Sequence, residues 1–126
     1  MVVLDTSVVI DHLRQLGKTS LLLRLEKKFP KQSLAISMIS LQELYGGEST
    51  REEEQEQLLL STVSPLKILP YNFETAKLAG EIERDLKRPI DFADAAIAAS
   101  AIINGAQLAT LNKKDFKGIS DLELLD

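Results

Sequence analysis

The sequence contains no cysteine and no tryptophan, a single histidine, and only six aromatic residues in all. The lack of cysteine excludes disulfides, thiol nucleophiles and cysteine-bound zinc. A lone His12 excludes any site built on two histidines, and we expect it to be a surface or interface residue. So few aromatic side chains argue against a base-stacking platform for single-stranded nucleic acid. The polar chemistry must therefore come from carboxylates, hydroxyls, lysine and arginine.

Long hydrophobic runs are also missing. No stretch approaches the roughly 18 to 20 apolar residues of a membrane span, and the N-terminus lacks the pattern of a signal peptide. The net charge of −4 is not typical of a protein that binds nucleic acid by charge alone. Basic residues gather in segments 24–31 and 113–117, where solvated surface is the favoured interpretation. We expect one cytoplasmic domain over residues 1–126, without a membrane partner.

Short apolar runs alternate with segments of helical periodicity along the whole chain. Predicted strands cover 2–4, 34–36, 66–69, 108–110 and 122–125. Predicted helices cover 7–16 with a stop at Gly17, 19–28, a short helix from Ser40 to Gly46, 50–61, 73–87 and 91–104. The alternation predicts an α/β fold with a mostly parallel sheet of four to five strands, covered by helices on both faces. The alanine-rich segment 91–104 should be a buried helix.

Acidic residues stand where the predicted strands end. Asp5 directly follows the first strand, Glu43 is expected in the first helical turn after the second, and Asp94 opens the helix before the fourth. Ligands of open parallel sheets bind beyond the carboxyl ends of the strands, so these side chains are expected to converge. Further polar candidates at the same edge are Asp91, Asn112 and Asp115.

Crowded carboxylates repel one another and raise their own pKa values unless a cation neutralises them. Mg²⁺ and Mn²⁺ prefer such oxygen ligands, and they activate water and neutralise phosphate charge. Each acid also has a structural alternative. Asp5 and Asp91 fit helix N-caps, and the helix dipole favours an anion at Asp94. Glu43 fits a capping box with Ser40.

Four motifs resemble those of PIN-domain ribonucleases. The first is Leu4-Asp5-Thr6-Ser7, and the second is the stretch 37–47 centred on Glu43. The third is Asp94 at the start of an apolar helix, and the fourth is 110–116, in the loop after a late strand. Their order and spacing and the chain length are similar to those of VapC-type toxins, the nuclease half of bacterial and archaeal toxin–antitoxin pairs.

The resemblance implies a three-layer α/β/α PIN-like fold and a metal-dependent endoribonuclease that hydrolyses RNA phosphodiester bonds. It implies that Asp5, Glu43 and Asp94 bind the Mg²⁺ or Mn²⁺ ion. Asn112 stands where many family members have an acid, so either Asp115 or Asp91 is expected to supply the missing charge. Asn112 can still offer a carbonyl oxygen to the metal or to water.

Two hydroxyls are further candidates. Thr6 and Thr110 are predicted to orient the carboxylates or a water molecule, or to make local capping and turn bonds instead.

The resemblance also implies a homodimer and a VapB-type antitoxin whose C-terminal segment blocks the acidic cleft. The apolar stripes of helices 7–16 and 19–28 fit a dimer or antitoxin groove, and fit core packing equally well. Two other hypotheses compete. A catalytically inactive PIN fold that binds RNA or protein is left open by Asn112. A receiver domain of two-component signalling would need adjacent acids after the first strand, where Asp5-Thr6 stands, and an Asp after the third, where Pro70-Tyr71 stands.

Overall fold

A computed structural model describes residues 1–15 and 19–126 of the protein. In this part of the chain five short strands form one sheet, in the order β3-β2-β1-β4-β5, and every pairing is parallel. The strands are β1 (Val2–Leu4), β2 (Leu34–Ser37), β3 (Lys67–Leu69), β4 (Gln107–Ala109) and β5 (Glu123–Leu124). The predicted parallel sheet is confirmed, with strand ends that differ by at most one residue.

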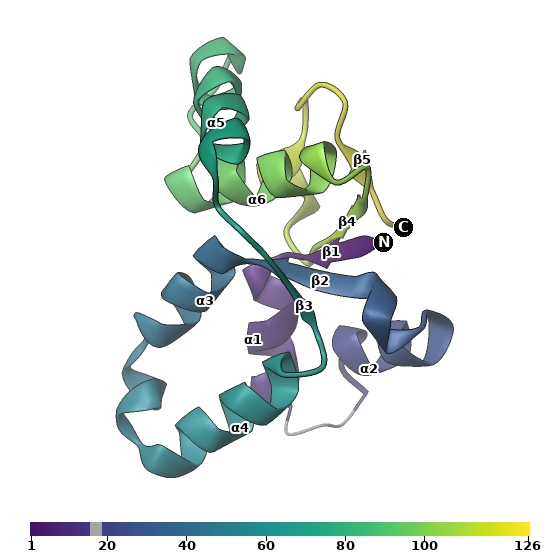
Figure 1. The fold of residues 1–126 in the computed structure, drawn as a ribbon, viewed down its shortest axis with the longest axis vertical. Helices are drawn as coiled ribbons and strands as arrows, with labels where there is room; N and C mark the ends of the chain where they lie inside the picture. Colours follow the sequence, from purple (N-terminus) through teal and green to yellow (C-terminus); the bar gives the residue numbers. More distant parts are fainter. Residues whose placement is uncertain (16–18) are drawn as a thin grey trace.

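Helices cover both faces of the sheet, as predicted. They are α1 (Thr6–Arg14), α2 (Leu21–Lys28), α3 (Met38–Tyr45), α4 (Glu53–Val63), α5 (Phe73–Asp85) and α6 (Phe92–Ile103), with the 3₁₀ turns η1 (Lys31–Ser33), η2 (Glu48–Arg51) and η3 (Lys113–Phe116). In Figure 1, α5 and α6 lie on one side of the strands and α1, α2 and α4 on the other. Leu16 and the predicted stop at Gly17 lie outside the described residues.

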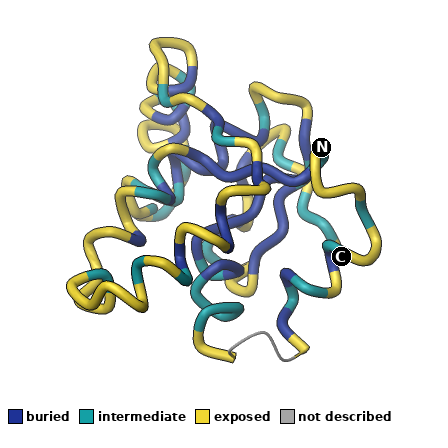
Figure 2. The backbone as a smooth tube through the Cα atoms, turned by 60° about the horizontal axis from the view of Figure 1, so that its bottom comes forward, coloured by how far each residue is buried: buried dark blue, intermediate teal, exposed yellow. Residues whose placement is uncertain are grey.

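Alternation along the strands produces the two cores. Val3 contributes to the apolar cluster beneath α5 and α6, while its neighbours Val2 and Leu4 belong to the cluster formed with α1, α2 and α4. Successive strand side chains point to opposite faces, so a sheet covered on both sides needs apolar residues at every position. Figure 2 accordingly shows buried backbone through the centre and exposed backbone at the periphery.

The apolar stripes of the first two helices are core. Val8 and Val9 of α1 and Leu22 and Leu25 of α2 are all buried in the cluster below the sheet. On the opposite face the alanine-rich helix α6 is buried from Ala95 to Ala101, which confirms the prediction of a buried helix there.

The helix after β2 begins differently from the prediction. Ser37, the last residue of β2, is the N-cap of α3, and its side chain accepts a hydrogen bond from the Ile39 N–H at 3.1 Å. The predicted capping box of Ser40 and Glu43 is therefore wrong, and Glu43 lies in the second turn of α3 rather than the first. The reason is local: Ser37 already satisfies an amide at the helix start, which leaves the Ser40 hydroxyl free for a tertiary contact.

The strand order places β1 between β2 and β4. The chain passes from β1 to one side to form β2 and returns to the other side to form β4, so a topological switch point lies between β1 and β4. The Asp5 N–H donates to the carbonyl of Ala109 at 2.9 Å across this point. The order also contradicts the receiver-domain hypothesis, since that fold has the order 2-1-3-4-5. Among the described residues no helix is both long and apolar enough to cross a membrane.

Candidate active site

Asp5 is the first residue beyond β1 and is buried, with 4% of its surface exposed. Although it occupies the N-cap position of α1, its side chain makes no capping hydrogen bond. Its Oδ2 instead accepts from Thr110 Oγ1 at 2.8 Å and from Ser7 Oγ at 2.7 Å. Among the described residues, every fully buried side-chain oxygen has a hydrogen-bond partner. Oδ1 of Asp5 has no partner, so this oxygen must be at least partly exposed to solvent. One oxygen of Asp5 is thus held and the other is available to a ligand.

The two hydroxyls that hold Asp5 also anchor the loop after β4. Thr110 Oγ1 accepts from the Asn112 N–H at 2.9 Å, and Ser7 Oγ accepts from the Leu111 N–H at 3.2 Å. Thr110 therefore makes both a tertiary hydrogen bond to Asp5 and a local turn hydrogen bond with Asn112. These are the two alternatives that the sequence had left open for this hydroxyl. Sequence reasoning missed Ser7. Its position two residues after an acid at a helix start was the signal that could have identified it.

Glu43 is oriented from the first turn of α1. Thr6 Oγ1 donates to Glu43 Oε1 at 2.6 Å and shares a second hydrogen bond with Ser40 Oγ at 2.9 Å. A carboxylate only accepts, so the Thr6 proton goes to Glu43 and Ser40 donates to Thr6. Thr6 is buried, whereas the remainder of Glu43 is exposed. The adjacent residues Thr6 and Ser7 therefore position Glu43 and Asp5, respectively. Ser40 also belongs to the site, although its spacing in the sequence did not reveal this.

Asp94 lies in the first turn of α6 and is half-buried. Its pKa is raised from 3.8 to about 7. Burial of the carboxyl is the largest cause, and the charges of four other carboxylates add to it. In decreasing order of effect they belong to Asp5, Asp115, Asp91 and Glu43. Every acid singled out in the sequence therefore acts on Asp94, which identifies one acidic region at the carboxyl end of the sheet.

The candidates for the fourth acid differ in placement. Asp115 is half-buried in η3, and its charge affects Asp94 more than that of Asp91 does. Asp91 is exposed at the N-cap position of α6, where its side chain makes no capping bond. Asn112 is exposed at the N-cap position of η3, where its side chain likewise makes no capping bond. Asp115 is thus the less exposed of the two acids and the one with the larger effect on the pKa of Asp94.

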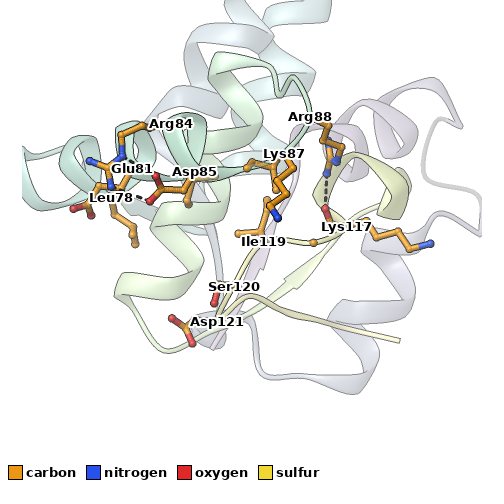
Figure 3. A pocket seen from close by; sticks show the side chains of 13 residues that line it. Leu78, Glu81, Arg84, Asp85, Lys87, Arg88, Lys117, Ile119, Ser120 and Asp121 are labelled. Carbon is orange, nitrogen blue, oxygen red and sulfur yellow. Dashed lines mark hydrogen bonds and ion pairs between the residues drawn. The ribbon is translucent and has the colours of Figure 1, made fainter.

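Arg88 supports the position of η3. Its Nη2 donates to the carbonyls of Asp115 at 3.0 Å and Lys117 at 2.6 Å, and Figure 3 shows the bond to Lys117. No spacing in the sequence pointed to this arginine, because its partners lie 27 and 29 residues away.

The donor set is suited to a hard divalent cation. Carboxylate oxygens are the ligands that Mg²⁺ and Mn²⁺ prefer, and Mg²⁺ usually keeps several waters and needs only one or two protein carboxylates. Over residues 1–15 and 19–126, no three acidic or histidine side chains stand close enough to hold an ion as they are. The acids thus share a region without forming a closed cage, as expected for mutually repelling charges. The residues fit a hydrated cation, toward which the side chains would draw together.

Two of the cavities in the described part of the chain lie in different relations to the acids. The larger, about 780 Å³, lies between the end of α5 and the loop 117–121, and none of the acids of the site lines it (Figure 3). The smaller, about 420 Å³, is bordered by Thr110, the residue that holds Asp5. Of the other polar groups, His12 lies outside the acidic region and contacts Ser20 Oγ at 2.7 Å through Nδ1.

Comparison with known proteins connects this geometry with a family. The PIN domain family matches residues 2–122. Ribonuclease VapC10 of Mycobacterium tuberculosis is 34% identical over 127 residues, which cover 98% of this chain and 91% of that protein. Ribonuclease VapC1 of Rickettsia felis is 36% identical over 132 residues, which cover 98% of this chain and 93% of its own length.

Solved structures agree with the sequence relatives. DNA-bound VapBC from Salmonella typhimurium superimposes with a TM-score of 0.83 and 26% identity, covering 99% of this chain and 96% of the matched chain. VapBC2 from Rickettsia felis bound to a promoter DNA fragment superimposes with a TM-score of 0.80 and 30% identity, covering 99% and 98%. On the family match, the relatives and the fold together, this chain belongs to the PIN domain family.

Proposed function

We propose that this protein is a Mg²⁺- or Mn²⁺-dependent endoribonuclease that acts as the toxin of a VapBC-type toxin–antitoxin pair. The carrying observation is the crowding of carboxylates around Asp94, whose pKa is raised to about 7. Strongly perturbed acids in one region are typical of functional sites, and a bound cation would relieve their repulsion. The matched relatives are named ribonucleases, and these names supply the class of reaction.

In this proposal Asp5, Glu43 and Asp94 hold the cation, and Asp115 adds negative charge beside them. When bound, the cation would lower the pKa of a coordinated water and neutralise charge on the scissile phosphate. The chain's own hydroxyls do the positioning: Thr110 and Ser7 fix one oxygen of Asp5 and so present the other.

Thr6 fixes Oε1 of Glu43 in the same way that Thr110 and Ser7 fix Asp5. The oxygen of a water molecule would form a bond to phosphorus and give up one proton to solvent, while the bond from phosphorus to the ester oxygen on the opposite side breaks. That ester oxygen leaves with the electron pair and takes up a proton.

The partners follow from the same proposal. The matched structures are toxin–antitoxin complexes, and we propose an antitoxin of the VapB type and a homodimer for this chain as well. An RNA substrate would place its activity in the cytoplasm. The match over residues 2–122 supports one PIN unit across the chain.

Cleavage of single-stranded RNA tests the proposed reaction directly. The purified protein should cut an RNA oligonucleotide in Mg²⁺ or Mn²⁺ and should not cut it in EDTA. Gel analysis of end-labelled RNA measures the products. RNA binding without cleavage in either metal would instead support the inactive binding module that Asn112 left open.

Expression in bacteria should arrest growth, because the enzyme would degrade cellular RNA. Co-expression of the proposed VapB-type antitoxin should restore growth, and Asp5→Asn should be harmless. Growth curves after induction measure the effect. Harmless expression of a protein that is active after purification would contradict the toxin assignment.

Divalent metal should stabilise the folded protein by mass action. At a metal concentration tenfold above Kd the stabilisation is about 1.4 kcal/mol, or a rise in Tm of about 5 °C. Asp94→Asn should shrink that rise, since it removes a charged ligand. Thermal unfolding in EDTA, in Mg²⁺, and in NaCl of equal ionic strength measures it. An equal rise in NaCl would show general screening instead of a metal site.

A further inference from the structure

The smaller cavity is a groove lined by basic residues from two distant parts of the sequence. Arg24 and Lys28 come from α2, and Lys113 comes from η3, after β4. Arg24 and Lys28 are four residues apart and so lie on the same face of the helix. We call this surface, defined by Arg24, Lys28 and Lys113, the basic groove.

No ion pair among the described residues neutralises the charges of the basic groove. All three side chains are exposed, and the salt bridges of the described residues lie elsewhere, in α5 and at η2. Lys28 Nζ lies 5.6 Å from the centre of the Phe29 ring. The acid in the groove wall is Asp126, so three cations face one carboxylate side chain in a protein whose net charge is −4.

The basic groove adjoins the acidic region. Ala109 and Thr110 line the basic groove, and Thr110 Oγ1 donates to Asp5 Oδ2 at 2.8 Å. The lining also includes the apolar residues Leu21, Leu25 and Leu111. A ligand that spans the acidic region and the basic groove therefore contacts carboxylates at one end and, next to them, basic and apolar side chains.

We propose that the basic groove binds the phosphates of the RNA strand next to the scissile phosphate, with Arg24, Lys28 and Lys113 as the phosphate-binding residues. The inference rests on the proposed ribonuclease function and names the path of its substrate. Repeating negative charge matches the three cations, and the aliphatic side chains beside them offer van der Waals contact to ribose. Continuity with Asp5 favours the substrate over a protein partner, whose binding is an outcome of the test.

The same two basic segments contain matched controls. Lys27 and Lys114 are exposed neighbours of Lys28 and Lys113, and neither lines the basic groove. Each pair has the same side chain, local sequence and secondary structure, so a general loss of positive charge would affect both equally. Only a specific groove separates them.

The test compares Lys28→Gln/Lys113→Gln with the control Lys27→Gln/Lys114→Gln in steady-state cleavage of a single-stranded RNA. We expect the groove variant to raise KM about tenfold at low salt with kcat within twofold of wild type, and the control to change neither. The dependence of log KM on log salt should become shallower by about 1.4 for two lost contacts. Thermal unfolding confirms that both variants fold.

The outcomes distinguish the two proposals. Cleavage by wild type with equal KM values for groove and control variants would overturn the groove and leave the ribonuclease intact. If wild type cuts no RNA, the ribonuclease proposal fails, and equilibrium binding of the same RNA then tests the groove by itself. Equal RNA affinity of the two variants, with weakened antitoxin binding only in the groove variant, would assign the surface to the antitoxin.

Discussion

Asp5→Asn is expected to lower RNA cleavage by at least about 100-fold. Removal of a residue that only orients a metal ligand typically costs about 10- to 100-fold, and Asp5 is proposed to bind the metal itself. The variant loses the charge that would hold the cation. It also replaces the solvent-reaching Oδ1 by an amide NH₂, which donates hydrogen bonds and cannot bind a metal. The loss should therefore fall on the reaction itself, measured as kcat/KM on single-stranded RNA.

The fold of this variant should persist, because both hydroxyl donors to Asp5 reach the same oxygen. The amide oxygen of Asn can take the place of Oδ2 and accept from Thr110 and Ser7 as before. Removing one repelling charge should leave the Tm unchanged or slightly raised. An unfolded variant would instead identify Asp5 as a structural residue.

A matched control exists for the same chemical change. Asp121 is exposed, is not among the acids whose charges raise the pKa of Asp94, and has φ of 68°, a conformation that Asn also adopts readily. Asp121→Asn should cleave RNA at the wild-type rate. Equal activity of Asp5→Asn and Asp121→Asn would contradict the assigned role of Asp5.

Asp94→Asn is expected to stabilise the metal-free protein above pH 7. The pKa of Asp94 is about 7 in the folded protein, against about 3.9 for an unfolded aspartate, so folding favours its protonated form. The associated stability is fully present below about pH 4 and is lost as pH rises through 7. Asn cannot ionise, and the variant escapes this loss.

The gain is expected to be about 1–2 kcal/mol at pH 8, reduced from the full value because Asp94 is partly exposed and screened by water. Urea unfolding in EDTA at pH 4, 6 and 8 measures the free energy of unfolding. The difference between variant and wild type should vanish at pH 4, and Asp121→Asn should track wild type throughout. A variant that loses stability with pH as steeply as wild type would show that Asp94 is not the responsible group.

Local sequence determined the framework of this protein. The apolar runs fix which segments are buried on both sides, because a strand residue must face one core or the other. The uncharged, alanine-rich stretch after Asp94 determines a buried helix. Asp5 and Asp94 could also be assigned to the site from the sequence, because Asp5 follows the end of a predicted strand and Asp94 stands at the start of a predicted helix.

Only the tertiary structure decided how the side chains pair. Thr6 bonds Glu43 across 37 residues and Thr110 bonds Asp5 across 105, both because β1 lies between β2 and β4. The same strand order joins α2 and η3 around the basic groove, whereas each basic segment by itself resembled solvated surface. Periodicity encodes which face of an element is buried. It does not encode which distant element lies beside that face, and the contacts of this site depend on that arrangement.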